Sequence, residues 1–216
     1  MLGHSLEELG FTREVTIRHT AVKEAVFPFA RFPGIDTQLG PEMKSTGEVM
    51  GLADDFGMAF AKAEEAAGLT LPMKGTVFLS LNPRDKTPAA LGAARSFAGM
   101  GFQLCATEGT AAWLRDNGLE YERVNKVREG RPHIVDKIIN GDIALVINTP
   151  SGKHPRQDEI AIRSTSWARR VPIITTIRAA VVAAQATRKL KQTAMSVKTL
   201  QEYTMDTHGK VPAPRV

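Results

Sequence analysis

Short apolar runs alternate with segments of helical periodicity from Gly75 almost to the end of the chain, and this alternation limits the possible folds more than any other feature. Residues 143–148 are almost wholly apolar, which is typical of a strand covered on both faces. Strand–helix units repeated at this spacing require parallel strands joined by right-handed crossovers. The sequence therefore predicts a three-layer α/β fold with a Rossmann-like, parallel five-stranded sheet. The predicted strands are residues 76–81, 102–106, 121–124, 143–148 and 172–175.

The N-terminal part of the chain has a different pattern. Prolines and glycines recur in residues 18–51 without a helical period, which predicts loops and short strands, with Val22–Phe29 as the best candidate strand. A helix that ends at a glycine C-cap is predicted over 56–68, and residues 71–75 resemble a linker. Because the chain begins in the middle of such a pattern, we expect it to be a piece of a longer protein. The helices predicted beyond the linker are residues 87–101, 109–118, 133–141, 158–170 and 177–192.

Polar side chains follow every predicted strand at its carboxyl end, which is where parallel sheets bind ligands. The strand that ends at Ala106 passes directly into Thr107, Glu108, Gly109 and Thr110, where a helix begins. Backbone N–H groups at a helix start carry partial positive charge, a glycine permits close approach, and the two threonines add hydroxyl donors. The polar residues at the strand ends are Ser80, Lys86, Thr107, Thr110, Asn125, Lys126, Asn148, Thr149, Ser151, Thr175 and Thr176.

These groups fit a phosphate, since Lys86 and Lys126 supply the counter-charge. Threonine and asparagine at such junctions are also common helix N-caps that bind no ligand. The two interpretations differ in their consequences. If the site binds phosphate, Thr110 and Lys126 are expected to lie outside the core, whereas capping threonines would contribute to stability. The occurrence of polar groups at every junction on one edge favours a ligand site.

No catalytic group is predicted. His133 and Asp136 lie near Lys126 in the sequence, but no nucleophile accompanies them in a recognisable order, and we expect His133 to begin a helix. The glycine-rich ATP loop of the GxxxxGK[ST] kind is absent. The single cysteine, Cys105, lies in an apolar strand, so we expect it to be a small buried residue, and no metal site is predicted.

The net charge of +5 permits an anionic ligand, but the basic residues are scattered, and only two Trp and two Tyr are available to stack on bases. Nucleic-acid binding is therefore not expected. No apolar run approaches the length of a membrane span, and no secretory segment opens the chain. We expect a cytoplasmic location without membrane contact.

The chain carries a series of longer motifs: FPGIDTQLGPEMKSTGEVMG (residues 32–51), LSLNPRDK (79–86), ATEGTA (106–111), VNKVREGRPHIVDKIINGD (124–142), VINTPSG (146–152) and IITT (173–176). In order and spacing, these motifs resemble one family, the large subunit of glutamine-dependent carbamoyl-phosphate synthetase. The resemblance covers nearly the whole chain, which would be the extreme C-terminal piece of the subunit. The motif at residues 32–51 and the segment from VNKVREGRPHI to INTPSG are the most specific.

The resemblance implies two domains. Residues 1–72 would be the end of the second ATP-grasp half, which phosphorylates carbamate, and residues 73–216 would be an allosteric domain with the fold of methylglyoxal synthase. That domain would bind nucleoside monophosphates of the UMP or IMP type and so control ATP-dependent carbamoyl phosphate synthesis for pyrimidine and arginine biosynthesis. The residues that match the family's nucleotide site are Ser80, Lys86, Thr107, Gly109, Thr110, Lys126, Asn148, Thr149 and Asp158.

The resemblance also implies further partners. Ornithine would bind at Glu24 and Thr175, a carboxylate and a hydroxyl suited to ammonium groups. The chain itself would bind no cofactor and would be catalytically inactive, whereas the full enzyme would use ATP with Mg or Mn, and K. The remainder of the large subunit and the small glutaminase subunit are the implied protein partners.

Two residues depart from the family pattern. Pro150 replaces a threonine, which removes a hydroxyl and an N–H donor, and Glu108 stands where a histidine can occur, which places a negative charge beside the phosphate. A free-standing lyase of the methylglyoxal synthase type is the main alternative. It would need a carboxylate base in a glycine-rich turn, where this chain has REGRPHIVD at residues 128–136. The cyclohydrolase step of purine synthesis is a second alternative, against which the motif at residues 32–51 argues.

Overall fold

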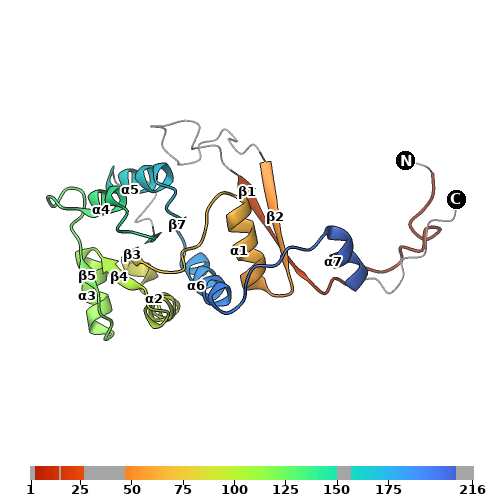
Figure 1. The fold of residues 1–216 in the computed structure, drawn as a ribbon, viewed down its shortest axis with the longest axis horizontal. Helices are drawn as coiled ribbons and strands as arrows, with labels where there is room; N and C mark the ends of the chain where they lie inside the picture. Colours follow the sequence, from red (N-terminus) through yellow and green to blue (C-terminus); the bar gives the residue numbers. More distant parts are fainter. Residues whose placement is uncertain (1–2, 15, 27–46, 150–156, 208–216) are drawn as a thin grey trace.

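The computed structural model describes residues 3–14, 16–26, 47–149 and 157–207. Its centre is a parallel sheet of five strands in the order β5-β4-β3-β6-β7, with helices on both faces (Figure 1). The predicted α/β fold with a five-stranded parallel sheet is therefore confirmed. The strands are β3 (Thr76–Ser80), β4 (Gln103–Ala106), β5 (Glu122–Arg123), β6 (Leu145–Asn148) and β7 (Ile173–Ile174).

Alternate residues of the strands face opposite helical layers. The helices are α2 (Pro88–Gly99), α3 (Glu108–Asp116), α4 (Ile134–Asn140), α5 (Gln157–Ala168) and α6 (Ile177–Gln192). Val77 and Leu79 of β3 pack in one core with residues of α2, α3 and α6, whereas Phe78 packs in a second core with residues of α4 and α5. Successive side chains of a strand point to opposite faces, so an almost wholly apolar strand fills both cores. Figure 1 shows the resulting three layers.

A two-stranded antiparallel hairpin precedes the sheet. It consists of β1 (Thr20–Val26) and β2 (Gly47–Ala53). The strand predicted over Val22–Phe29 is confirmed as far as Val26, and residues 27–29 lie outside the described residues. The sequence does not single out β2, because glycines interrupt its apolar residues and no clear period of two remains.

Helix α1 (Phe56–Ala66) connects the hairpin to the sheet domain, since it packs against β1 and β2 and also against α6 (Figure 1). The predicted glycine C-cap is present, with Gly68 in the left-handed region at φ 88°. Leu71, in the predicted linker, is buried in the main core together with Ala61 of α1. The predicted linker is therefore packed against the core at Leu71, and α1 lies between the β1–β2 hairpin and α6.

The last described helix, α7 (Leu200–Thr207), is not predicted by the sequence pattern. Its Tyr203 hydroxyl donates to the Leu52 carbonyl oxygen of β2 at 2.8 Å, and Lys62 of α1 donates to the same oxygen at 2.8 Å. The Tyr203–Leu52 contact places α7 beside the hairpin, although the two residues are about 150 positions apart in the sequence. Among the helices that the structure describes, we find none that is long and apolar enough to cross a membrane.

Candidate functional site

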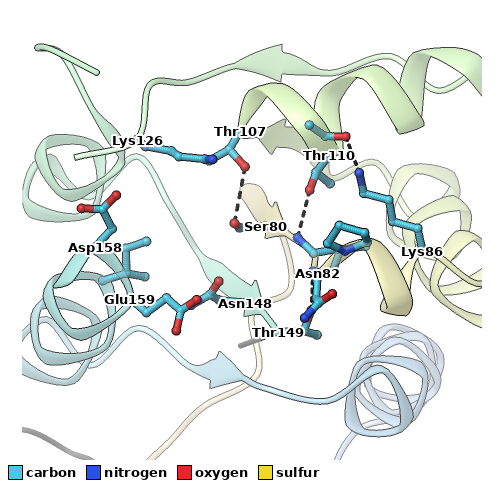
Figure 2. Close-up of a pocket in the computed structure, with 14 residues that line it drawn as sticks. Ser80, Asn82, Lys86, Thr107, Thr110, Lys126, Asn148, Thr149, Asp158 and Glu159 are labelled. Atoms are coloured by element: carbon cyan, nitrogen blue, oxygen red, sulfur yellow. Dashed lines mark hydrogen bonds between the residues drawn. The ribbon is translucent and has the colours of Figure 1, made fainter. Parts of the chain in front are cut away.

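A pocket of about 260 Å³ lies beyond the carboxyl ends of β3, β4 and β6 (Figure 2). Every residue predicted for a nucleotide site lines it. The predicted residues that line the pocket are Ser80, Lys86, Thr107, Gly109, Thr110, Lys126, Asn148, Thr149 and Asp158. The sequence prediction does not include Leu81, Asn82, Pro83, Glu159 and Ile162, which also line the pocket.

Thr107 occupies the N-cap position of α3, but its side chain makes no capping hydrogen bond. Its hydroxyl lies 3.4 Å from the Ser80 hydroxyl instead, inside the pocket. Other N-caps of the chain, such as Thr87 and Thr176, accept hydrogen bonds from the backbone of their helices. The simple capping interpretation therefore does not hold for Thr107, whose hydroxyl remains at the start of a helix where an anion is favoured.

Thr110 lines the pocket and is also a buried core residue. Its side chain is 2% exposed, and its hydroxyl oxygen accepts a hydrogen bond from the Leu81 backbone N–H at 2.9 Å. The expectation that Thr110 lies outside the core is therefore wrong. The reason is that the first turn of α3 packs against the end of β3, so the threonine stabilises the neighbouring loop. Thr149 acts similarly, because its hydroxyl oxygen accepts from the Asn82 N–H at 2.8 Å.

Two lysines line the pocket from different loops. Lys86 Nζ donates to the Gly109 carbonyl oxygen at 2.6 Å, which holds its ammonium group over the first turn of α3. Lys126 enters from the loop that follows β5. A Cβ on Gly109 would lie 3.8 Å from Lys86 Nζ, an ordinary contact, so the fold itself does not require a glycine there. A side chain at this position would instead occupy the space beside the ammonium group.

The negative charge of Glu108 does not face the pocket. Its carboxylate forms an ion pair with Arg123 of β5, with Oε2 2.6 Å from the Arg123 Nε, and it does not line the cavity. The expected conflict between Glu108 and a phosphate is therefore absent from the described site. Pro150, the other departure from the family pattern, lies outside the described residues.

The first turn of α5 contributes two acidic residues to the pocket lining, Asp158 and Glu159. Asp158 lies 3.7 Å from the Arg128 Nε through its Oδ1, and Glu159 is 8% exposed. Ile162, one turn further along, also lines the pocket and is buried. Glu159 and Ile162 are three positions apart on α5, and positions i and i+3 of a helix share a face, so their common orientation could have been predicted from the sequence.

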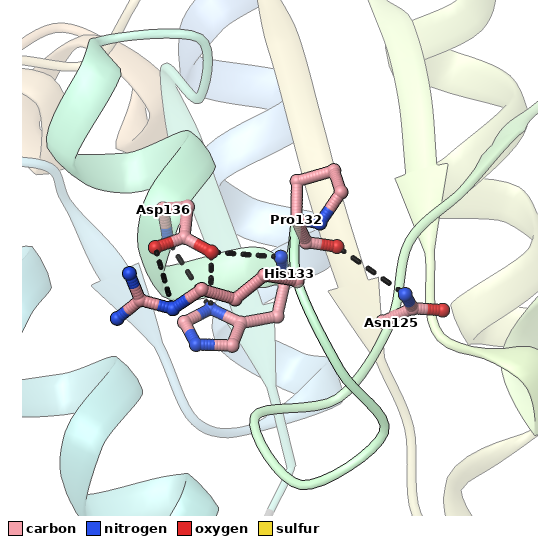
Figure 3. A network of polar contacts seen from close by, with 5 residues as sticks. Asn125, Pro132, His133 and Asp136 are labelled. Atoms are coloured by element: carbon pink, nitrogen blue, oxygen red, sulfur yellow. Dashed lines mark hydrogen bonds and ion pairs between the residues drawn. The ribbon is translucent and has the colours of Figure 1, made fainter.

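His133 begins α4, as predicted. Its side chain accepts from the Asp136 N–H at 3.3 Å, and the Asp136 carboxylate accepts from the His133 N–H at 3.0 Å (Figure 3). This reciprocal capping box gives both side chains a structural role. Asn125 was predicted at the ligand edge, but it does not line the pocket, and its side chain donates to the Pro132 carbonyl oxygen at 3.3 Å.

A second cavity, of about 220 Å³, lies between the hairpin unit and the end of the sheet. Glu24 and Glu64 line it together with Trp167 and Ile173, but Thr175 does not and is exposed. Burial raises the pKa of Glu24. Burial, and secondly the charge of Glu24, raise the pKa of Glu64 to about 7. The two carboxylates thus share a site that disfavours two negative charges.

The remaining candidate groups show no sign of chemistry. Cys105 is fully buried in the sheet, and burial, followed by the charge of Glu122, raises the pKa of its thiol to about 12. An unreactive, buried thiol is what the strand pattern predicts. Within the described ranges, no group of three or more His, Cys, Asp or Glu side chains could hold a metal ion.

Residues 89–175 match the family model of the MGS-like domain. The chain is also similar to proteins named carbamoyl phosphate synthase large chain, with 55% identity for Nostoc sp., 54% for Myxococcus xanthus and 49% for Archaeoglobus fulgidus. Each alignment covers 94% of this chain but only 18 or 19% of the relative. The chain therefore spans less than a fifth of the length of these relatives.

Proposed function

We propose, from the homology of this chain to part of the carbamoyl phosphate synthase large chain, that it is a regulatory region whose pocket binds a nucleoside monophosphate. In this proposal the MGS-like domain senses the nucleotide without transforming it. The rest of the large chain would carry out ATP-dependent carbamoyl phosphate synthesis.

The observation that carries the proposal is the arrangement at the start of α3. An uncapped helix N-terminus, the hydroxyl of Thr107 and the side chains of Lys86 and Lys126 line a single pocket. Helix N-termini and ammonium groups favour phosphate because both place positive charge and N–H donors around it. Asn148 and Thr149 then supply polar groups for the nucleoside part of the ligand.

The function of the surrounding enzyme follows from the homology and is part of the same proposal. Residues 1–72 would complete the second ATP-grasp half, and the small glutaminase subunit and the rest of the large chain would be partners. ATP, Mg or Mn, and K would bind outside this chain. The pathway context would be pyrimidine and arginine biosynthesis in the cytoplasm.

The cavity of Glu24 and Glu64 supports a second effector, an amino acid with ammonium groups such as ornithine. The side-chain atom Glu24 Oε2 is buried and has no hydrogen-bond partner among the described residues, so an ammonium group would satisfy it. Thr175 does not line the cavity, but Ile173, two residues earlier on the same segment, does. Titration with ornithine tests this part separately.

Replacing Lys126 with alanine is expected to weaken nucleotide binding about ten- to a hundredfold, because a charge-assisted hydrogen bond to phosphate contributes roughly 1.5–3 kcal/mol. Calorimetric titration with UMP and with IMP at fixed salt measures the effect. Lys74→Ala is the matched control, since Lys74 is exposed and precedes β3 at the opposite edge of the sheet. Unchanged binding by Lys126→Ala would remove the phosphate site from the proposal.

Replacing Thr110 with valine is expected to reduce stability and binding together. The Leu81 N–H would lose its buried acceptor, which lowers the free energy of unfolding by about 1–3 kcal/mol, and the pocket would lose a hydroxyl. Thr107→Val is the matched variant: its hydroxyl makes no capping bond, so we expect weaker binding with nearly unchanged melting temperature. Calorimetry measures nucleotide binding by both variants, and thermal denaturation measures their stability. Equal destabilisation of the two variants would contradict this assignment of their roles.

The lyase alternative lacks support in the structure. Methylglyoxal synthase chemistry would require a carboxylate base in the turn at residues 128–136. Asp136 of that turn is engaged in the capping box of α4, and Glu129, its other carboxylate, accepts from the Lys126 N–H at 2.9 Å. Neither residue lines the pocket. A colorimetric assay for methylglyoxal from dihydroxyacetone phosphate is expected to show no product.

A further inference from the structure

Residues 193–207 form a strap that runs from the end of α6 to the hairpin of β1 and β2. In Figure 1 the chain leaves α6 and crosses to the far side of the hairpin, where α7 lies. Met195, in the part of the strap before α7, packs against the main core and also against the small core formed by Ala53 of β2 with Met58 and Ala59 of α1. The strap therefore contacts both the sheet domain and the hairpin.

The strap docks on the hairpin at the Leu52 carbonyl oxygen of β2. Tyr203 of α7 and Lys62 of α1 each donate a hydrogen bond to this oxygen at 2.8 Å, and Lys62 Nζ also donates to the Tyr203 hydroxyl at 3.2 Å. Tyr203 is 5% exposed, and the His19 ring lies beside it, with the two ring centroids 5.3 Å apart. This group of hydrogen bonds joins α7, α1 and β2 at one point.

Little of α7 is buried by this docking. Among residues 200–204, Tyr203 alone is buried, and Leu200 at the start of the helix is 64% exposed. A helix of eight residues is too short to be stable by itself, and one buried large side chain adds only a modest packing contribution. We therefore expect the docked and released forms of the strap to differ little in free energy.

The elements that hold the strap also carry the two carboxylates of the second cavity. Lys62 and Glu64 are two positions apart on α1, and Glu24 lies on β1, which pairs with the strand of Leu52. The positions of the two carboxylates relative to each other thus depend on how α1 lies on the hairpin. Docking of Tyr203 fixes that arrangement at one point, and closely packed elements transmit a shift at one point to their other contacts.

We propose that the strap is a regulatory device: its docking through Tyr203 holds the cavity of Glu24 and Glu64 in the form that binds an amino acid with a side-chain ammonium group, and its release lowers the affinity for that ligand. The inference rests on the proposed amino-acid effector. It adds control by a segment that contributes no residue to the described lining of the cavity. Because coupling between two sites is reciprocal, the bound ligand must also favour the docked strap.

Two variants release the strap to different degrees. Tyr203→Phe removes the hydroxyl and keeps the ring, and Tyr203→Ala removes both. In the 216-residue chain, backbone amides of α7 and those beside Leu52 in the hairpin are expected to exchange with deuterium about two- to tenfold faster in Tyr203→Phe than in the wild type, and faster still in Tyr203→Ala. Calorimetric titration with ornithine is expected to show weaker binding in the same order, by at least about fivefold in Tyr203→Ala.

The reciprocal effect separates regulation from a merely structural role. Saturating ornithine is expected to slow hydrogen exchange in α7 of the wild type, although no residue of the strap lines the cavity as described. Thr204→Ala is the matched control, because Thr204 is exposed on the same helix and its hydroxyl donates to the Leu200 carbonyl oxygen within α7 at 2.7 Å. Its exchange beside Leu52 and its affinity for ornithine should equal those of the wild type.

Melting temperatures establish that the variants fold, and Tyr203→Phe together with the effect of ornithine on the wild type decides if Tyr203→Ala does not. Three results would each overturn the strap alone: unchanged exchange in Tyr203→Phe, an affinity for ornithine that survives the release of α7, or exchange in α7 that bound ornithine does not slow. Failure of the wild type to bind ornithine at millimolar concentration would overturn the proposed amino-acid effector as well.

Discussion

Replacing Gly51 with alanine is expected to lower the free energy of unfolding by about 3 kcal/mol or more, the largest effect of a single methyl group that we expect in this chain. Gly51 lies on β2, where α1 crosses the hairpin closely. A Cβ at this position would lie 2.6 Å from the backbone nitrogen of Ala63 and would overlap the carbonyl oxygen of Ala59. Both contacts are to helix backbone, which cannot rotate away as a side chain can.

Gly92→Ala is the matched control. Gly92 lies inside α2, and a Cβ there would meet no atom within 4 Å. Alanine in a helix interior is favoured over glycine by roughly 0.5–1 kcal/mol, so this variant is expected to be slightly more stable than the wild type. Urea denaturation of both variants measures the difference. Similar stabilities for the two would show that the hairpin and α1 are not packed as closely as the structure has them.

Replacing Glu64 with glutamine is expected to change how stability depends on pH. The pKa of Glu64 in the folded state is about 7, raised from 4.5 by burial and by the charge of Glu24. The folded protein thus binds the proton more tightly than the unfolded chain does. The contribution of this proton to stability is fully present below pH 4.5 and is lost as the pH rises towards and through 7.

The expected size of this loss follows from the shift of the pKa. Each unit corresponds to about 1.4 kcal/mol, so Glu64 is expected to remove about 2–3 kcal/mol of stability between roughly pH 5 and pH 8. Glutamine does not ionise, and the advantage of Glu64→Gln over the wild type should therefore grow by that amount across the range. Denaturant titrations at several pH values measure it.

Two further variants test what causes the raised pKa of Glu64. Glu24→Gln removes the neighbouring charge but leaves the burial of Glu64, so the pH dependence should shrink without disappearing. Glu65→Gln changes the adjacent, exposed carboxylate, which does not line the cavity, and should behave as the wild type. A Glu64→Gln profile parallel to that of the wild type would exclude the shared carboxylate site.

The amino-acid sequence alone was sufficient to predict the sheet and the position of the pocket at the carboxyl ends of β3, β4 and β6. Strand–helix alternation has only a few solutions in three dimensions, and parallel strands bring their carboxyl ends to one edge. Ser80 and Asn148, which are distant in the sequence, are for this reason predicted to lie at the same edge, and both line the pocket. The helix start at His133 was predictable for a local reason, because helix capping depends on residues within one turn.

Only the tertiary structure decided which way side chains point and what they contact. Thr110 is a core residue, and Glu108 turns towards Arg123, because of how α3 packs on β3 and β5. The pairing of β2 with β1, the docking of α7 through Tyr203 and the shared cavity of Glu24 and Glu64 join segments that are distant in sequence. Local periodicity and capping are encoded in neighbouring residues, whereas these contacts depend on the relative placement of whole elements, which no short stretch of sequence specifies.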